Sequence, residues 1–240
     1  MDEVERILAE FARRERTLPG DFYSLTRPVN LFTHQQSSRH FLRLLAAEAL
    51  IPLAGKKILD VGCGEGGHLL EMEKWGARRA DLAGIDLIES RVARARTRLG
   101  DQPGPDSSPD VRVGSASELP WPAGRFDIVH QNTVFTSIID DRMKRAVAGE
   151  ILRVLKPDGV LIWYDFLFNN PTNPHVKGIG AREIRSLFPD CVVRLSRVTL
   201  APPLARRLVP VTWIGSLLLE KLHVFNTHYL AIVRKREGPR

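Results

Sequence analysis

Apolar positions change their spacing along this chain, and the change divides it into two parts. Over about residues 2–16 they recur every three to four residues, which predicts an amphipathic helix. A second helix is predicted over about 37–50, before the helix-breaking Pro52, while residues 21–36 between the two look irregular. Residues 1–55 are therefore expected to form a helical N-terminal cap.

From residue 56 onward, short apolar runs alternate with helical patterns. Strands are predicted near residues 56–61, 81–86, 110–114, 126–131, 160–165, 191–199 and 228–234. Helices are predicted near residues 66–75, 89–99, 141–155 and 181–188. Such alternation favours an α/β fold with a doubly wound, mainly parallel sheet, here as one domain over residues 56–240.

One segment of that domain departs from the alternation. Residues 200–226 are rich in Leu, Val and Trp, and they are predicted to form a helical insert before the last strand. The apolar run from Trp213 to Leu219 is too short to span a bilayer. The pattern leaves open whether the insert is a flap packed on the core, a lid over a substrate, or a surface that touches lipid.

Charge and cysteine content narrow the partners and the location. The chain has 240 residues and a formal net charge of +7, but its basic residues are scattered and no aromatic side chains interleave with them as in RNA-binding motifs. Nucleic acid is therefore a poor candidate, and an anionic substrate or membrane surface fits better. Two cysteines, Cys63 and Cys191, form no disulfide framework, and the charged N-terminus lacks an apolar signal core. A cytoplasmic location is expected.

The stretch around Asp60 carries the strongest functional signal. An apolar run ends at this acid, and Gly62, Gly64 and Gly66 follow at alternating positions before a helical pattern. This order predicts a buried strand, a tight turn and a helix N-terminus, where bare main chain can lie against a ligand. The stretch also fits the dinucleotide pattern G-x-G-x-x-G, but a pyrophosphate disfavours an adjacent carboxylate, whereas a ligand amine favours one.

This stretch closely resembles motif I of the class I, S-adenosylmethionine-dependent methyltransferases, whose pattern is acid-x-Gly-x-Gly-x-Gly. Four further stretches extend the resemblance over about residues 56–165, namely Gly84–Leu87, Gly114–Pro120, Trp121–Val129 and Glu150–Ile162. The resemblance implies a Rossmann-like sheet of seven strands whose last strand is antiparallel. It also implies S-adenosyl-L-methionine as the cofactor and methyl transfer as the activity, with no metal ion.

The resemblance assigns the cofactor contacts by position. Asp60, Gly62, Gly64 and Gly66 would surround the part of the cofactor that carries the amine. Asp86, followed by Leu87, would bind the ribose, because a carboxylate can accept hydrogen bonds from both hydroxyls. Ser115, Ala116 and Ser117 would face the adenine, although Ser115 stands where relatives carry an acid, and Gln131 and Asn132 would face the sulfonium and its methyl group.

A general base is expected if the acceptor is an oxygen of high pKa. Many relatives carry a histidine after the fourth strand, where this chain has Thr136 and Ser137. Asp165, which follows the fifth apolar run, and His175, in the next loop, are the predicted catalytic residues. The alternatives are that Asp165 caps a turn and that His175 is simply exposed.

The predicted function is S-adenosylmethionine-dependent methyl transfer to a small-molecule or glycan acceptor, with a hydroxyl oxygen as the methylated atom. Stretches such as Ile162–Phe166 and Ile184–Phe188 resemble bacterial methyltransferases of polysaccharide or natural-product assembly, which would allow a lipid-linked acceptor. The alternatives are methylation of RNA or protein, a non-catalytic cofactor-binding module, and a nicotinamide oxidoreductase, against which Asp60 argues. The sequence leaves the acceptor and the oligomeric state open.

Overall fold

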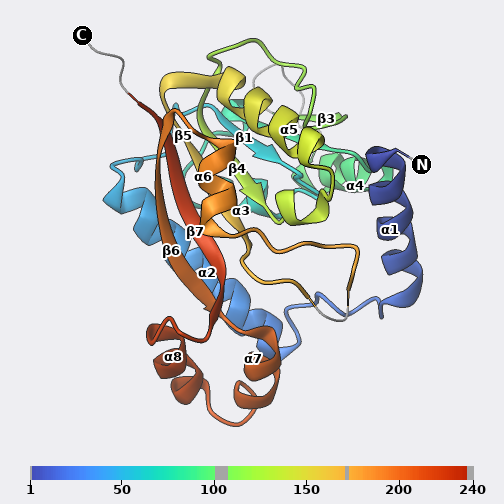
Figure 1. The fold of residues 1–240 in the computed structure, drawn as a ribbon, viewed down its shortest axis with the longest axis vertical. Coiled ribbons are helices and arrows are strands. Elements are labelled where there is room, and N and C mark those ends of the chain that lie inside the picture. Colours follow the sequence, from blue (N-terminus) through green and yellow to red (C-terminus); the bar gives the residue numbers. More distant parts are fainter. Residues whose placement is uncertain (1, 101–107, 171–172, 237–240) are drawn as a thin grey trace.

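The computed structural model describes residues 2–100, 108–170 and 173–236. Two helices, α1 (Glu3–Thr17) and α2 (Pro28–Ala47), precede a sheet (Figure 1). The strands found in the described residues are β1 (Ile58–Val61), β2 (Leu82–Asp86), β3 (Asp110–Val113), β4 (Phe126–Asn132), β5 (Leu155–Phe166), β6 (Cys191–Leu200) and β7 (Asn226–Lys235). The elements between them are α3 (Gly67–Lys74), α4 (Glu89–Leu99), α5 (Asp141–Val154), α6 (Ala181–Leu187), α7 (Pro202–Leu208) and α8 (Trp213–Lys221), with the 3-10 turns η1 (Arg79–Asp81) and η2 (Phe135–Ser137).

The strands form one sheet in the order β3-β2-β1-β4-β5-β7-β6. Neighbours from β3 to β5 pair in parallel, whereas β7 runs antiparallel to both β5 and β6. The predicted α/β class, with a mainly parallel seven-stranded sheet and an antiparallel last strand, is confirmed. The strand order reverses between β1 and β4, and sheets of this class bind ligands at the carboxyl edge beside such a reversal.

Helices cover both faces of the sheet, and each face has its own apolar core. On one face α5 and α6 pack through side chains such as Val147. On the other face α2, α3 and α4 pack through side chains such as Phe41. Because successive side chains of a strand point to opposite faces, Leu59 enters the first core and Ile58 enters the second. Asp60 therefore points to the face that α2 and α3 cover.

Helix α2 begins at Pro28, well before its predicted start near residue 37. Proline suits the first turn of a helix, where its missing N–H leaves no bond unmade. Phe32, one turn later, is buried, and its ring meets the ring of Trp213 edge to face with centroids 5.2 Å apart. The predicted irregular stretch is thus wrong from residue 28 onward, because contact with a distant segment stabilises helix there.

The segment between β6 and β7 folds into α7 and α8, as the predicted helical insert requires. These helices enclose a third, smaller core against α2, built from Phe32, Leu200, Ala205 and Val209. Every helix in the described part of the chain is too short or too polar to cross a bilayer.

Candidate functional site

The turn after β1 has the backbone conformation that its glycines predict. Gly62, Gly64 and Gly66 have positive φ angles of 71°, 52° and 76°, a region that residues with a Cβ rarely adopt. At Gly62 a side chain is also excluded by space, because a Cβ would lie 2.5 Å from Cγ2 of Val134. The close approach of the β4–η2 connection to this turn therefore depends on glycine.

Asp86 ends β2 and ties the glycine turn in place. Its Oδ2 accepts a hydrogen bond from the backbone N–H of Gly64, and its Oδ1 accepts one from Ile88, both at 2.9 Å. Burial raises the pKa of Asp86, while these hydrogen bonds and the charge of Arg91 act in the opposite direction. Each carboxylate oxygen can accept a further hydrogen bond, so Asp86 retains capacity for a ligand.

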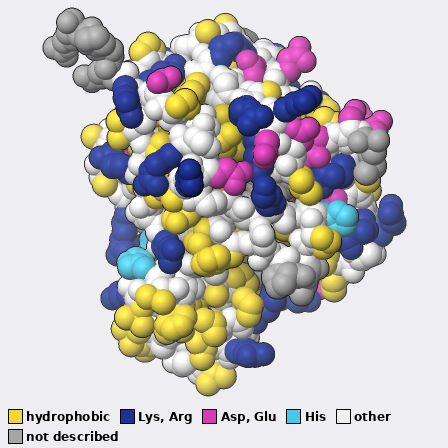
Figure 2. Space-filling model, viewed as in Figure 1, with side chains coloured by type: hydrophobic (Ala, Val, Ile, Leu, Met, Phe, Trp, Pro, Cys, Tyr) yellow, Lys and Arg dark blue, Asp and Glu magenta, His cyan; other side chains and the backbone are white. Residues whose placement is uncertain are grey.

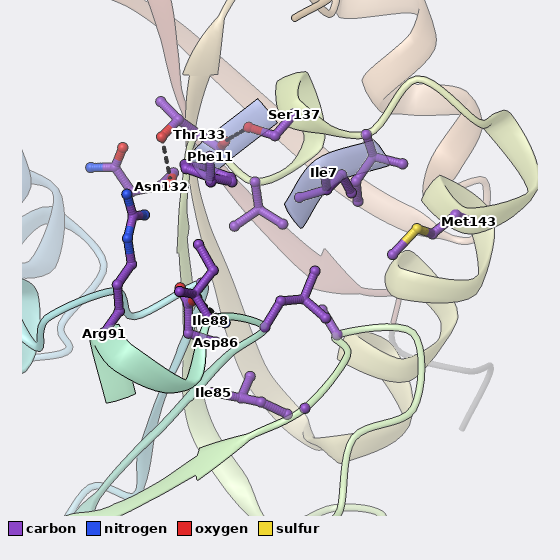
Figure 3. Close-up of a pocket in the computed structure, with 16 residues that line it drawn as sticks. Ile7, Phe11, Ile85, Asp86, Ile88, Arg91, Asn132, Thr133, Ser137 and Met143 are labelled. Carbon is purple, nitrogen blue, oxygen red and sulfur yellow. Dashed lines mark hydrogen bonds between the residues drawn. The ribbon is translucent and has the colours of Figure 1, made fainter. Parts of the chain in front are cut away.

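A cavity opens beside Asp86 at the carboxyl edge of the sheet (Figure 3). Its walls come from α1, the glycine turn, the end of β2 with α4, the turn after β3, the β4–η2 connection and α5. Ile7 and Met143 form an apolar side, and Asn132 and Arg91 lie across from them (Figure 3). The site can thus accept a ligand with one polar and one apolar part.

Helix α1 forms a wall of this cavity from outside the sheet. Ile7 is buried. The guanidinium of Arg91 lies over the ring of Phe11, with its Cζ atom 4.4 Å from the ring centroid. Glu15, near the end of the helix, pairs with Arg91 at 3.6 Å and with Arg94 at 3.4 Å. The sequence predicted an amphipathic helix here, but nothing in its pattern indicated that the apolar side would reach the site.

Some of the predicted cofactor residues line the cavity and others do not. Those in its wall are Gly62, Asp86, Leu87, Ala116 and Asn132. Those outside the lining, among the described residues, are Asp60, Gly64, Gly66, Ser115, Ser117 and Gln131. In this second group, Gly64 and Gly66 form the glycine turn, and Ser115, Ser117 and Gln131 make hydrogen bonds next to the lining residues.

Ser115 and Ser117 make a turn after β3 and leave Ala116 facing the cavity between them. Their hydroxyl oxygens lie 2.7 Å apart, and the backbone N–H of Ser117 donates to Oγ of Ser115 over 3.2 Å. A predicted contact between Ser115 and adenine would have to share a hydroxyl that already bonds within its own turn.

Gln131 and Asn132 end β4 with different roles. Gln131 is buried, its Oε1 accepts a hydrogen bond from the backbone N–H of Val134 over 3.1 Å, and its Nε2 donates to the carbonyl of Tyr164 over 3.4 Å. Asn132 lines the cavity, and its Nδ2 lies 2.9 Å from Nε2 of His68. Of the two residues, Asn132 is the one placed to meet a ligand.

Asp165 lies at the end of β5, inside the protein. It is fully buried and accepts hydrogen bonds from the hydroxyl and backbone N–H of Thr136 and from the backbone N–H groups of Phe135 and Phe166. Burial raises the pKa of Asp165 to about 7, and these hydrogen bonds act in the opposite direction. Asp165 does not line the cavity, so the geometry favours the turn-capping alternative over the catalytic one.

His175 lies beside α1 and outside the cavity lining. Its Nε2 is 3.8 Å from Oε2 of Glu10, and its backbone carbonyl accepts a hydrogen bond from Arg6 over 3.4 Å. The side chain is 45% exposed. The geometry gives His175 no contact with the place where a cofactor would bind.

A buried pair that the sequence did not predict joins β1 to β4. Asp60 lies opposite His130 in the parallel register, and Nδ1 of His130 is 2.7 Å from Oδ1 of Asp60. Burial lowers the pKa of His130, although the neighbouring carboxylate acts to raise it. The hydrogen bond between Nδ1 of His130 and Oδ1 of Asp60 therefore lies wholly inside the protein.

A second polar cluster connects the cavity wall to α2. Nδ1 of His68 lies 3.4 Å from Oε2 of Glu71, whose Oε1 lies 3.0 Å from Nε2 of His34. Burial by itself would lower the pKa of His68, but the pair with Glu71 and the charge of Asp60 outweigh it and raise the pKa. The only sequence signal was the i, i+3 spacing of His68 and Glu71 on α3, which by itself predicts no more than a surface pair.

These residues fit S-adenosylmethionine. Oδ2 of Asp60 is buried and has no hydrogen-bond partner among the described residues, which suits an acceptor reserved for a ligand amine. A Cβ at Gly64 would meet no atom within 4 Å, so the main chain there is open to a ligand. Asp86 can accept from ribose hydroxyls, and the apolar side chain of Leu87 beside it can pack against a base. In the described residues, no three His, Cys, Asp or Glu side chains are arranged to hold a metal ion.

Comparison with known proteins agrees with this geometry. Residues 59–163 match a family model described as a methyltransferase domain. A sterol 24-C-methyltransferase of Gibberella zeae is 28% identical over 186 residues, covering 70% of this chain and 47% of that protein. A ubiquinone biosynthesis O-methyltransferase of Thiobacillus denitrificans is 32% identical over 149 residues, covering 62% and 60%. The chain spans about half the length of the curated relatives it matches.

Solved structures show the same fold at low sequence identity. The magnesium protoporphyrin IX methyltransferase of Synechocystis, solved with bound S-adenosylmethionine, superposes with a TM-score of 0.64 at 16% identity, covering 98% of each chain. An S-adenosylmethionine-dependent methyltransferase of Mesorhizobium loti gives a TM-score of 0.55 at 18% identity, covering 79% of this chain and 96% of that one.

Proposed function

We propose that this protein transfers a methyl group from S-adenosyl-L-methionine to a small-molecule acceptor. Through residues 59–163 the chain belongs to the class I, S-adenosylmethionine-dependent methyltransferase family. The observation that carries the proposal is the cavity beside Asp86, which lies against the glycine turn and has a free apolar side. One part of this cavity suits the cofactor, and the apolar part suits an acceptor.

Residues of this chain would bind and orient the cofactor, which supplies the electrophilic methyl group when it is bound. Asp86 would accept hydrogen bonds from the ribose hydroxyls, and the free oxygen of Asp60 would accept one from the amine. The open main chain at Gly64 would let the amino-acid part approach closely. Ala116, with Ser115 beside it, would face the adenine.

The acceptor that fits best is an apolar small molecule carrying a hydroxyl group. Ile7, Phe11 and Met143 bring apolar surface to the cavity from α1 and α5. Their chemistry favours an apolar acceptor over a glycan, because sugar hydroxyls need polar partners when they are buried. The relatives named for sterol and ubiquinone biosynthesis also favour an apolar acceptor.

His68 is the residue we favour as proton acceptor for a hydroxyl, ahead of Asp165 and His175. It contacts the cavity wall through Asn132. Its partner Glu71 contacts His34, whose side chain is 40% exposed. A proton taken up at His68 would therefore have polar groups between it and solvent, whereas Asp165 is surrounded by the donors of its own turn.

The test is incubation of the protein with methyl-labelled S-adenosylmethionine and fractionated bacterial extract. Asp86→Ala serves as the blank, because it removes the carboxylate that faces the cavity. Asp158→Ala, which removes an exposed acid near the start of β5, serves as the matched control. We expect label in the lipid or small-metabolite fraction with the wild type and the control, and none with Asp86→Ala.

Other outcomes would redirect the proposal. Label in the glycan fraction would replace the apolar acceptor with a sugar, and label in RNA or protein would overturn the acceptor class. Tight binding of S-adenosylhomocysteine without label in any fraction or defined acceptor would favour a non-catalytic binding module.

A further inference from the structure

Helix α8 buries two polar side chains and exposes two large apolar ones, while Trp213, Leu217 and Leu219 pack against the third core. Ser216 and Glu220 are buried, with 0% and 2% of their surface exposed, whereas Ile214 is 71% and Leu218 is 59% exposed. Residues four apart lie on the same side of a helix, so the exposed residues form one stripe and the buried polar residues another. An exposed stripe of Ile and Leu beside buried Ser and Glu departs from the pattern expected for a helix on a water-facing surface.

Specific contacts of the polar side fix this orientation. The carboxylate of Glu220 faces α2, where it lies 3.4 Å from Nε2 of His40 and 3.8 Å from Nη2 of Arg39. The hydroxyl of Ser216 donates to the carbonyl of Thr212 over 2.9 Å. Rotation of α8 to bury its apolar stripe would separate Glu220 from His40 and Arg39 on α2. The exposed stripe is therefore a property of the folded protein.

The stripe continues into a larger apolar surface. Val211 precedes α8 and is 82% exposed, while Leu222, Val224 and Phe225 follow it and are 60%, 72% and 40% exposed. Together with Ile214 and Leu218, these residues make up what is called here the α8 face. Figure 2 shows hydrophobic side chains gathered on the part of the molecule where α7 and α8 lie in Figure 1. A patch of this kind marks an interaction site.

The exposed Asp, Glu, Lys and Arg side chains of the segment that carries the α8 face all have one sign of charge. Between residues 200 and 226 the sequence contains one acid, Glu220, and it is buried. The basic residues of the same segment, Arg206, Arg207 and Lys221, are exposed. An apolar stripe flanked by cations, without an exposed carboxylate in the same segment, is complementary to a bilayer surface that carries anionic headgroups.

Charge also disfavours a second copy of the chain as the occupant. A symmetric pair would bring the same surface of each copy together, including its cations. The formal net charge of +7 adds a general repulsion between copies. A lipid surface bears the opposite charge and takes up apolar side chains without requiring a shaped pocket.

We propose that the α8 face docks on the surface of a membrane that contains anionic lipid. The exposed apolar side chains enter the boundary between headgroups and acyl chains, and Arg206, Arg207 and Lys221 contact the lipid phosphates. The face lies between the end of β6 and the start of β7, and the start of β7 pairs with the carboxyl end of β5. Docking would therefore bring the carboxyl edge of the sheet, which holds the cavity, toward the membrane.

The experiment is co-sedimentation of the full chain with vesicles of phosphatidylcholine alone and of equimolar phosphatidylcholine and phosphatidylglycerol. We expect binding to the anionic vesicles to be at least roughly tenfold tighter, because each basic residue near an anionic surface contributes severalfold to affinity. The double variant Ile214→Ser, Leu218→Ser should lose at least roughly tenfold in binding to the anionic vesicles. Its matched control, Ile51→Ser with Val192→Ser, removes two exposed apolar residues elsewhere and should bind as the wild type does.

A second pair of variants isolates the charges. Arg206→Gln with Arg207→Gln should weaken binding to anionic vesicles by roughly tenfold, whereas Arg142→Gln with Arg145→Gln, which removes the same charge from the exposed side of α5, should not. The proposal would be overturned if the wild type did not bind vesicles. It would also be overturned if the Ile214→Ser, Leu218→Ser variant and the Arg206→Gln, Arg207→Gln variant both bound them as well as the wild type does. A dimer in sedimentation equilibrium that the Ile214→Ser, Leu218→Ser variant abolishes would overturn it too. The assay needs neither cofactor nor acceptor, so its outcome is independent of methyl transfer, and binding of S-adenosylhomocysteine checks that each variant is folded.

Discussion

Asp60 and His130 face each other across β1 and β4, with Oδ1 of the acid 2.7 Å from Nδ1 of the imidazole. Both side chains are buried. The other carboxylate oxygen of Asp60, Oδ2, has no hydrogen-bond partner among the described residues. His130 thereby fixes the side chain of Asp60, the first residue of motif I, and determines which of its oxygens remains for a ligand.

We expect His130→Leu to destabilise the protein by about 1.5–3 kcal/mol. Leucine is similar in size to histidine but has no N–H, so the buried carboxylate of Asp60 would lose its hydrogen bond. Urea unfolding measures this change in the free energy of unfolding. A double-mutant cycle with Asp60→Asn separates the pair from the cavity that the smaller side chain leaves. Additive effects of the two substitutions would contradict a coupled pair.

Gly62→Ala should weaken binding of S-adenosylhomocysteine by tenfold or more, measured by calorimetry. The added Cβ meets Val134 at 2.5 Å and must displace the β4–η2 connection that lines the cavity. Gly124→Ala is the matched control, because Gly124 also has a positive φ, of 66°, but a Cβ there meets no atom within 4 Å. Both variants should lose about 1–2 kcal/mol from backbone strain, and only the first should lose affinity. Equal affinities would remove the Gly62 turn from the binding site.

Asp165→Asn should lower the free energy of unfolding by about 1–3 kcal/mol. The carboxylate now accepts hydrogen bonds from backbone N–H groups, and the NH2 group of asparagine, itself a donor, cannot accept them. Turnover per folded molecule should stay within a few-fold of the wild type. His68→Asn should show the opposite result, with turnover reduced and stability less affected. Loss of turnover in Asp165→Asn at unchanged stability would restore Asp165 as the catalytic base.

The pair of His68 and Glu71 predicts a pH-dependent stability. The pKa of His68 is raised, so its contribution is complete below its ordinary value of about 6.5 and is lost as the pH rises through the folded-state value. Burial by itself would raise the pKa of Glu71, but His68 and the other partners lower it, so that contribution is lost only as the pH falls below its ordinary value of about 4.3. The stability lost in His68→Gln should therefore be largest between the ordinary pKa values of the two groups, about 4.3 and about 6.5, and should shrink as the pH rises through the raised folded-state pKa of His68.

The control for this pH series is His223→Gln, since His223 is exposed and bonds only to the carbonyl of Arg197 and to Asn226 among the contacts described. Its stability difference from the wild type gives the baseline for replacing an exposed histidine with glutamine. A difference for His68→Gln that stays constant with pH would show that the ring does not change its protonation on unfolding.

The features that the sequence determined by itself are local. The strand–turn–helix around Gly62, Asp86 at the end of β2, and the alternation that gives the α/β class each depend on neighbouring residues, so spacing and residue type were sufficient to predict them. Motif I added the cofactor because its acid and glycines lie within one turn. Helix α2 marks the limit, because its early start depends on a contact between Phe32 and Trp213 that lie far apart in the chain.

Tertiary structure decided the remaining features, because each depends on which residues meet across the fold. Asp60 meets His130 only through the register of β1 against β4. The sequence places Asp165 after an apolar run whether it is a catalytic base or caps a turn. Only the position of η2 shows that its carboxylate accepts hydrogen bonds from Phe135 and Thr136. The sequence also does not indicate that Ile214 and Leu218 of α8 are exposed, because the apolar side of a helix usually packs against the core. The burial of Glu220 against α2 reverses that orientation, because a buried carboxylate needs partners and Glu220 has Arg39 and His40 beside it on α2.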